Sequence, residues 1–201
     1  MLYSQDYLEQ RVTNAQLHKK LVSLRLHNIY TLFGSFIAGP HDLTDFAGNG
    51  QLNTDDRPVI IFKAPQFAYT DNEPAYVRLL ALMDNLNPNP NQILHVTQAA
   101  DGRAVVERLT AYWAARNKFL HTGVGIKETA SVEQMLHQVR GPLLSIVRES
   151  PDFEAAYYPL LTMARQLHII KPEAARKLLI ELEVANPLRQ DAKKLRQYLY
   201  N

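Results

Sequence analysis

Apolar residues recur every three or four positions along most of the chain, and one stretch in its first third interrupts this pattern. Such spacing places side chains on one face of a helix, so each run predicts an amphipathic helix. The clearest run follows Asp101-Gly102 and predicts a long helix. The inner stripe expected for that helix consists of Val105, Leu109, Tyr112, Trp113, Arg116 and Leu120. The pattern as a whole predicts an all-α protein.

Residues 51–71 form the interruption. Residues 53–58 are rich in turn formers, and Pro58 disfavours helical backbone at Arg57. The next residues, Val59 to Phe62, are β-branched or aromatic, which predicts a short extended segment near residues 59–63. Residues 93–96 are a weak candidate for its pairing partner. A strand that is apolar on both faces needs cover on both, so we expect it to pack against something beyond its own helices.

The last third of the chain repeats with a period of 36 residues. Pro151 and Pro187 each follow one amphipathic run and precede the next, and the period is close to the ~34 residues of a tetratricopeptide unit. We therefore expect antiparallel, tetratricopeptide-like helical hairpins, with residues 188–200 as a solvated capping helix. The apolar positions related by the repeat are Val139 and Ala175, Leu143 and Leu179, Ile146 and Leu182, and Ala156 and Ala192.

Two further signals bear on the predicted organisation. Ser131 and Gln134 predict a capped helix start, and Gly141-Pro142 is expected to kink or split the helix that follows. The loop of residues 85–91, rich in Asn and Pro, marks a soft boundary. We expect a helical segment with the turn-rich stretch over residues 1–71 and a tetratricopeptide-like domain over residues 72–201, and the two can pack as one unit.

Composition narrows the function classes. The chain has 201 residues, 46% of them apolar and 21% charged, as in an ordinary globular protein. It has no cysteine, which excludes disulfides and thiolate chemistry. The net charge of +2 argues against a nucleic-acid partner, and no apolar run approaches the ~20 residues of a membrane span. We therefore expect a cytoplasmic chain that neither binds nucleic acid nor enters a membrane.

Residues 53–65 carry a resemblance. Their sequence, NTDDRPVIIFKAP, resembles the NTDDRP-x-x-x-F-x-A-P segment of spermidine synthase-like proteins, which are relatives of the polyamine aminopropyltransferases. A looser similarity covers most of the chain. In that family the segment follows a catalytic domain that binds decarboxylated S-adenosylmethionine, and some members are membrane-anchored. The glycine-rich turn and the strand–helix alternation of such a domain have no match here. The resemblance thus implies a C-terminal part without the catalytic core, and no cofactor of its own.

The same segment holds the candidate site. Paired carboxylates suit an amine or a metal ion, although adjacent residues of an extended chain point in opposite directions, so that only one can face a given ligand. The alternatives are a turn capped by Asn53 and Asp55 with Asp56 paired to Arg57, and a seam against the catalytic domain. No histidine pairing or serine elbow supports a metal or catalytic residue. The candidate interface or ligand motif consists of Asn53, Thr54, Asp55, Asp56, Arg57 and Pro58.

Three functions remain open from the sequence. The first is a non-catalytic interaction or scaffold domain of a spermidine synthase-like protein, which docks to its own catalytic domain or to another protein. A homodimer is a further possibility for its partner. The second is a part that contributes residues to an aminopropyltransferase active site and cannot turn over substrate alone. The third is a structural extension without a ligand.

Overall fold

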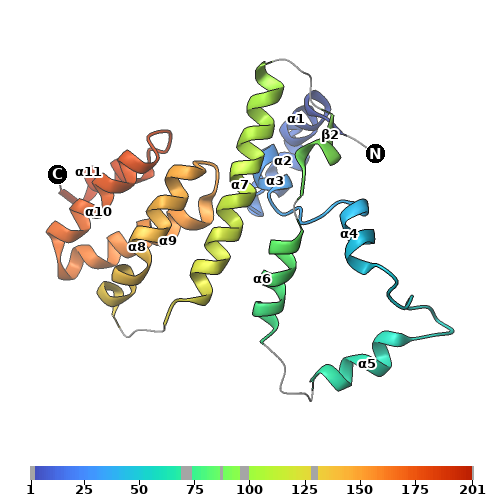
Figure 1. The fold of residues 1–201 in the computed structure, drawn as a ribbon. Coiled ribbons are helices and arrows are strands. Elements are labelled where there is room, and N and C mark those ends of the chain that lie inside the picture. The colour runs from blue at the N-terminus through green and yellow to red at the C-terminus, as the bar shows by residue number, and fades with distance from the viewer. Residues whose placement is uncertain (1–2, 69–73, 87, 96–99, 128–130, 201) are drawn as a thin grey trace. The chain divides into compact units, whose positions relative to one another are not determined.

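The computed structural model describes residues 3–68, 74–86, 88–95, 100–127 and 131–200. These residues are 75% helical and contain essentially no sheet, so the predicted all-α fold is confirmed (Figure 1). Within these ranges no helix combines the length and the apolar character needed to cross a membrane. The elements are β1 (Tyr3–Ser4), α1 (Gln5–Thr13), α2 (Ala15–Ser23), α3 (Ile29–Phe33), α4 (Pro40–Ala47), α5 (Val59–Ala68), α6 (Ala75–Asn85), the 3-10 helix η1 (Pro90–Gln92), β2 (Leu94–His95), α7 (Ala100–Val124), α8 (Val132–Glu149), α9 (Glu154–Ile170), α10 (Pro172–Ala185) and α11 (Asp191–Tyr200).

The chain divides into two compact units. One contains residues 1–36 together with residues 89–201, and the other contains residues 37–88. The second unit ends within the loop that the sequence marks as a soft boundary. The expected boundary lay after residue 71, whereas here residues 1–36 belong to the same unit as the C-terminal part of the chain.

Long-range polar contacts explain why residues 1–36 join the first unit. The indole Nε1 of Trp113 on α7 donates a hydrogen bond to the carbonyl of Phe33 at 2.9 Å. Arg116, one turn further along, donates to the carbonyls of Gly34 at 2.8 Å and Phe36 at 2.6 Å. A Cβ atom at Gly34 would overlap the Tyr112 ring, so the close approach of this segment to α7 requires glycine. These contacts satisfy the carbonyls where α3 ends.

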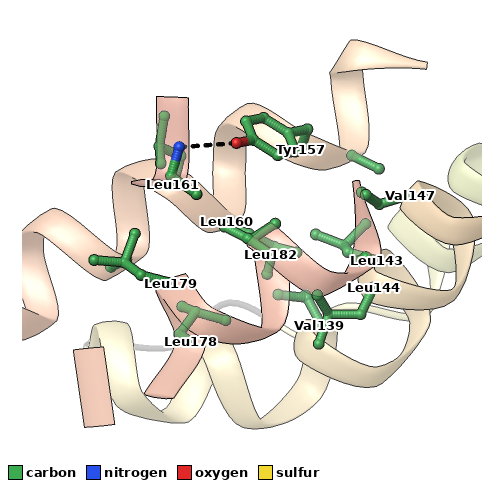
Figure 2. Packing of buried hydrophobic residues seen from close by; sticks show 14 of the residues in the cluster. Val139, Leu143, Leu144, Val147, Tyr157, Leu160, Leu161, Leu178, Leu179 and Leu182 are labelled. Atoms are coloured by element: carbon green, nitrogen blue, oxygen red, sulfur yellow. Dashed lines mark hydrogen bonds between the residues drawn. The ribbon is translucent and has the colours of Figure 1, made fainter. Parts of the chain in front are cut away.

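The first unit contains two core clusters. One joins α3 and β2 to α7. The other lies mainly between α8, α9, α10 and α11, which pack consecutively against one another (Figure 1). Side chains from these helices interdigitate in Figure 2. Each of the eight positions related by the 36-residue period is buried, which confirms the predicted inner faces. They are Val139, Leu143, Ile146, Ala156, Ala175, Leu179, Leu182 and Ala192.

The prediction of an extended segment near residues 59–63 is wrong, because Val59–Ala68 form helix α5. The backbone N–H of Ile60 donates to Asn53 Oδ1 at 3.0 Å, which satisfies a donor in the first turn of the helix. The candidate strand partner is also engaged elsewhere, since β2 pairs in parallel with β1. Local capping therefore prevails over β-propensity, which depends strongly on context.

Of the kink or split expected at Gly141-Pro142, the split does not occur, because α8 runs through both residues. Gly141 and Pro142 are exposed, whereas Val139 and Leu143 on either side are buried. Core packing on both sides of the proline thus offsets the missing backbone hydrogen bond.

Candidate functional site

The predicted motif forms a tight turn at the start of α5. Thr54 and Arg57 face each other across it, with the N–H of Thr54 donating to the Arg57 carbonyl at 3.2 Å and the N–H of Arg57 donating to the Thr54 carbonyl at 3.0 Å. Asn53 caps α5 as described above, and Asp55 and Asp56 occupy the turn. The pairing of Asp56 with Arg57, one of the sequence-based alternatives, is not among the ion pairs of the described residues.

The two carboxylates of the motif have different surroundings. Asp56 and Arg57 line two adjoining hollows, of about 450 and 330 Å³, whereas Asp55 lines neither. The first hollow includes Leu52 and Val59, and the second includes Pro58 and Phe62. The motif therefore places one carboxylate in the hollows, together with apolar side chains, Arg57 and, in the second hollow, Lys63. The expectation that the two aspartates point in opposite directions assumed an extended chain, whereas both lie in a turn.

A second recess lies in the first unit, between α9 and α11. It has a volume of about 540 Å³, within the ~300–1,000 Å³ range of ligand pockets. Its α11 side follows helical spacing, because Asp191, Lys194, Leu195, Tyr198 and Leu199 are three or four residues apart and share one face. Arg165 contributes from α9. We call this recess the α9/α11 groove.

The α9/α11 groove combines an apolar floor with charged walls. Leu195 is buried and Leu199 is half-buried against the core, whereas Tyr198 is 84% exposed. Arg165 and Lys194 are exposed, and neither forms an ion pair within the described part of the chain. The groove thus offers two cations beside a surface that can bury an apolar group.

Polar contacts fix the start of α11 and hence the position of the groove. The buried Tyr157 hydroxyl accepts a hydrogen bond from the backbone N–H of Ala192 at 3.0 Å, drawn as the dashed line in Figure 2. Arg189, just before α11, pairs with Glu154 of α9 at 2.5 Å and donates to the Tyr158 hydroxyl at 3.3 Å. The first turn of α11 is therefore attached to α9 at both a main-chain and a side-chain position.

The ionisation of these groups supports the same attachment. Burial raises the pKa of Tyr157 above its usual value, so the hydroxyl stays neutral at physiological pH. Burial alone would lower the pKa of Arg189, but the hydrogen bond and charge of Glu154 raise it above the usual value. Both residues therefore keep the protonation states that these contacts require.

No group of three or more metal-ligating side chains occurs among the residues that the structure describes. Comparison with protein-family models, with curated proteins and with solved structures finds no match for this chain.

The sequence does not mark the α9/α11 groove, because residues 188–200, which include Lys193, Lys194 and Arg196, match the pattern of a solvated capping helix. The structure separates the three, because Lys194 lines the groove and Arg196 pairs with Glu183 at 2.6 Å. The spacing of Lys194, Leu195 and Tyr198 was a visible signal, but its meaning depends on Arg165, which lies in a different helix.

Proposed function

We propose that this chain is a non-catalytic helical interaction domain and that the α9/α11 groove is its contact surface. The observation that carries the proposal is the exposed Tyr198 beside the apolar floor of the groove. Tyrosine and arginine are enriched among residues that dominate binding energy at interfaces. Repeated helical hairpins also form extended surfaces that bind segments of other proteins, which supports a tetratricopeptide-like role.

Selection of random peptides displayed on phage, with the full chain as bait, tests this function. We expect selected peptides to bind the wild type and to lose about tenfold in affinity for Tyr198→Ala, since truncating a central aromatic residue commonly costs more than 1 kcal/mol. Leu188→Ala is the matched control, because Leu188 is 78% exposed and lies outside the groove. Failure to select any peptide, or equal effects of the two substitutions, would contradict the proposed function.

The resemblance at residues 53–65 extends the proposal to a parent protein. On this view the chain is the C-terminal part of a spermidine synthase-like protein and docks to the catalytic domain of that protein or to another partner. A second candidate function is that residues of this segment contribute to an aminopropyltransferase active site. The observation behind it is that Asp56 lines both hollows beside apolar side chains, where an amine must compete for its carboxylate with Arg57 in both hollows and with Lys63 in the second.

A further inference from the structure

We infer that the α9/α11 groove binds a peptide segment in which an acidic side chain stands next to an apolar one. This inference rests on the proposed interaction function and adds the chemistry of the partner. It combines two features of the groove: cations without acidic partners, and an apolar floor between them.

The basic residues of the first unit include paired and unpaired side chains. Several pair with acids: Arg189 with Glu154, Arg196 with Glu183, Arg140 with Glu181 and Lys171 with Glu133. Arg148 and Lys193 are unpaired within the described residues, but neither lines the groove. Arg165 and Lys194 have no such partner within the described ranges, although both line the same recess. Two free cations that face one recess create a local preference for negative charge.

The apolar floor makes this preference useful for binding. An exposed ion pair by itself contributes only ~0–1 kcal/mol, so a carboxylate alone would bind weakly. An apolar side chain placed over Leu195 and Leu199 adds burial at roughly 25 cal/mol per Å². Tyr198 can cover such a side chain with its ring and hydrogen-bond through its hydroxyl. A ligand that satisfies the whole groove therefore carries both an acid and a neighbouring apolar group.

Other ligands fit the groove less well. A nucleic acid presents repeated phosphates, but Asp191 lies one turn before Lys194 and would repel a second one. A drug-sized ligand usually has most of its surface enclosed, whereas this groove lies between two helices at the surface. Self-association about a twofold axis would bring the same patch of each copy together, and each patch carries two cations against the single carboxylate of Asp191, so the two patches would repel each other. A peptide segment is the occupant that the charges and the shape favour.

Charge reversal tests the inference in the full chain. We expect random heptapeptides selected on the wild type to be enriched in Asp or Glu beside Leu, Ile or Phe. On the double variant R165E/K194E we expect the enriched charge to change to Lys or Arg. For a synthetic peptide selected on the wild type, the reversal is expected to weaken binding about tenfold or more, because it places like charges together. R165Q/K194Q removes the charges without reversing them and guards against loss of folding in the Glu variant.

The control variant is R148E/K193E. Arg148 and Lys193 are also exposed, lie outside the groove, and give the same change in net charge. It should select the same peptides as the wild type. If the peptides selected on the wild type lack acidic residues, the inference is wrong but the interaction function stands. The same holds if R165E/K194E selects peptides of the same composition as the wild type does. If no peptide is selected, both fail. The inference would also be wrong if the wild type bound a single-stranded oligonucleotide or associated with itself, and R165Q/K194Q abolished that binding or association.

Discussion

Adjacent residues on α10 lie in opposite environments. Leu179 is completely buried between helices, whereas Ile180, of the same composition, is 44% exposed. Apolar character alone therefore does not decide which side chain holds the helices together. The 36-residue period cannot make that distinction, because it relates Leu179 to Leu143 and Ile180 to Leu144, which is also buried. The helical spacing of Ala175, Leu179 and Leu182 on one face does make it.

Truncating these two residues should have very different effects. We expect Leu179→Ala to reduce the free energy of unfolding by about 2–5 kcal/mol, because it leaves a cavity in a packed core. Ile180→Ala, the matched control, should cost less than about 1 kcal/mol. Urea unfolding followed by circular dichroism measures both. Similar losses for the two variants would mean that this helical spacing does not define the inner face of α10.

The residues of the candidate sites were predictable to different degrees. Asn53 was predicted to cap a turn together with Asp55, but its side chain instead accepts a hydrogen bond from the start of α5. The different surroundings of Asp55 and Asp56 do not follow from the alternation of an extended chain, because both residues lie in a turn. Arg165 could not be foreseen, because its role depends on α11 packing beside α9, a tertiary contact that leaves no trace in the local pattern.

At the scale of whole elements, residues 59–62 show where propensity fails. Their β-branched and aromatic side chains favour a strand, but a strand is stable only when a partner satisfies its backbone groups. A helix satisfies those groups internally and needs only a cap, which Asn53 supplies. Long periodic runs such as α7 and α8 were predictable because packing and local preference agree there.

The exposed side chains of α5 allow a test of whether residues 59–62 form an exposed helix or the covered strand that the sequence predicts. Ile60 is 63% exposed and Phe62 is 70% exposed. We expect Ile60→Glu/Phe62→Glu to leave the chain folded and to change the free energy of unfolding by only about 0.5 kcal/mol per site, as is usual at the surface. Thermal unfolding followed by circular dichroism provides the measurement.

The matched control changes two buried residues of α6. Leu80→Glu/Met83→Glu should be strongly destabilising, because it buries two charges without partners. If the α5 variant unfolds as readily as the α6 variant, Ile60 and Phe62 are buried side chains and the assignment of α5 as an exposed helix is wrong.

At the scale of the whole molecule, the two compact units carry the two candidate sites separately. The α9/α11 groove belongs to the unit of residues 1–36 and 89–201, and the motif of residues 53–58 belongs to the unit of residues 37–88. The sequence marked the end of the second unit through its Asn- and Pro-rich loop. It did not mark the beginning, because the docking of Phe33 and Gly34 on α7 joins segments about 80 residues apart.

This separation allows the second candidate function to be tested without disturbing the first. If the motif contributes to a polyamine site, spermidine should bind the full chain through the Asp56 carboxylate. We expect Asp56→Asn to weaken that binding about two- to fivefold, because an exposed ion pair contributes ~1 kcal/mol or less. Asp55→Asn is the matched control and should have no effect, since Asp55 lies outside both hollows. Isothermal titration calorimetry at low salt measures the three affinities.

The same titrations distinguish a specific site from general attraction of a polycation. Equal weakening by Asp55→Asn and Asp56→Asn would indicate nonspecific attraction, and the motif would then be only the cap and turn that begin α5. An assay with putrescine and decarboxylated S-adenosylmethionine completes the test. We expect no aminopropyl transfer by this chain alone, because the sequence contains no glycine-rich turn after a strand to hold the nucleotide part of that substrate. Turnover that Asp56→Asn abolishes would instead place a complete active site in this chain and contradict the non-catalytic function.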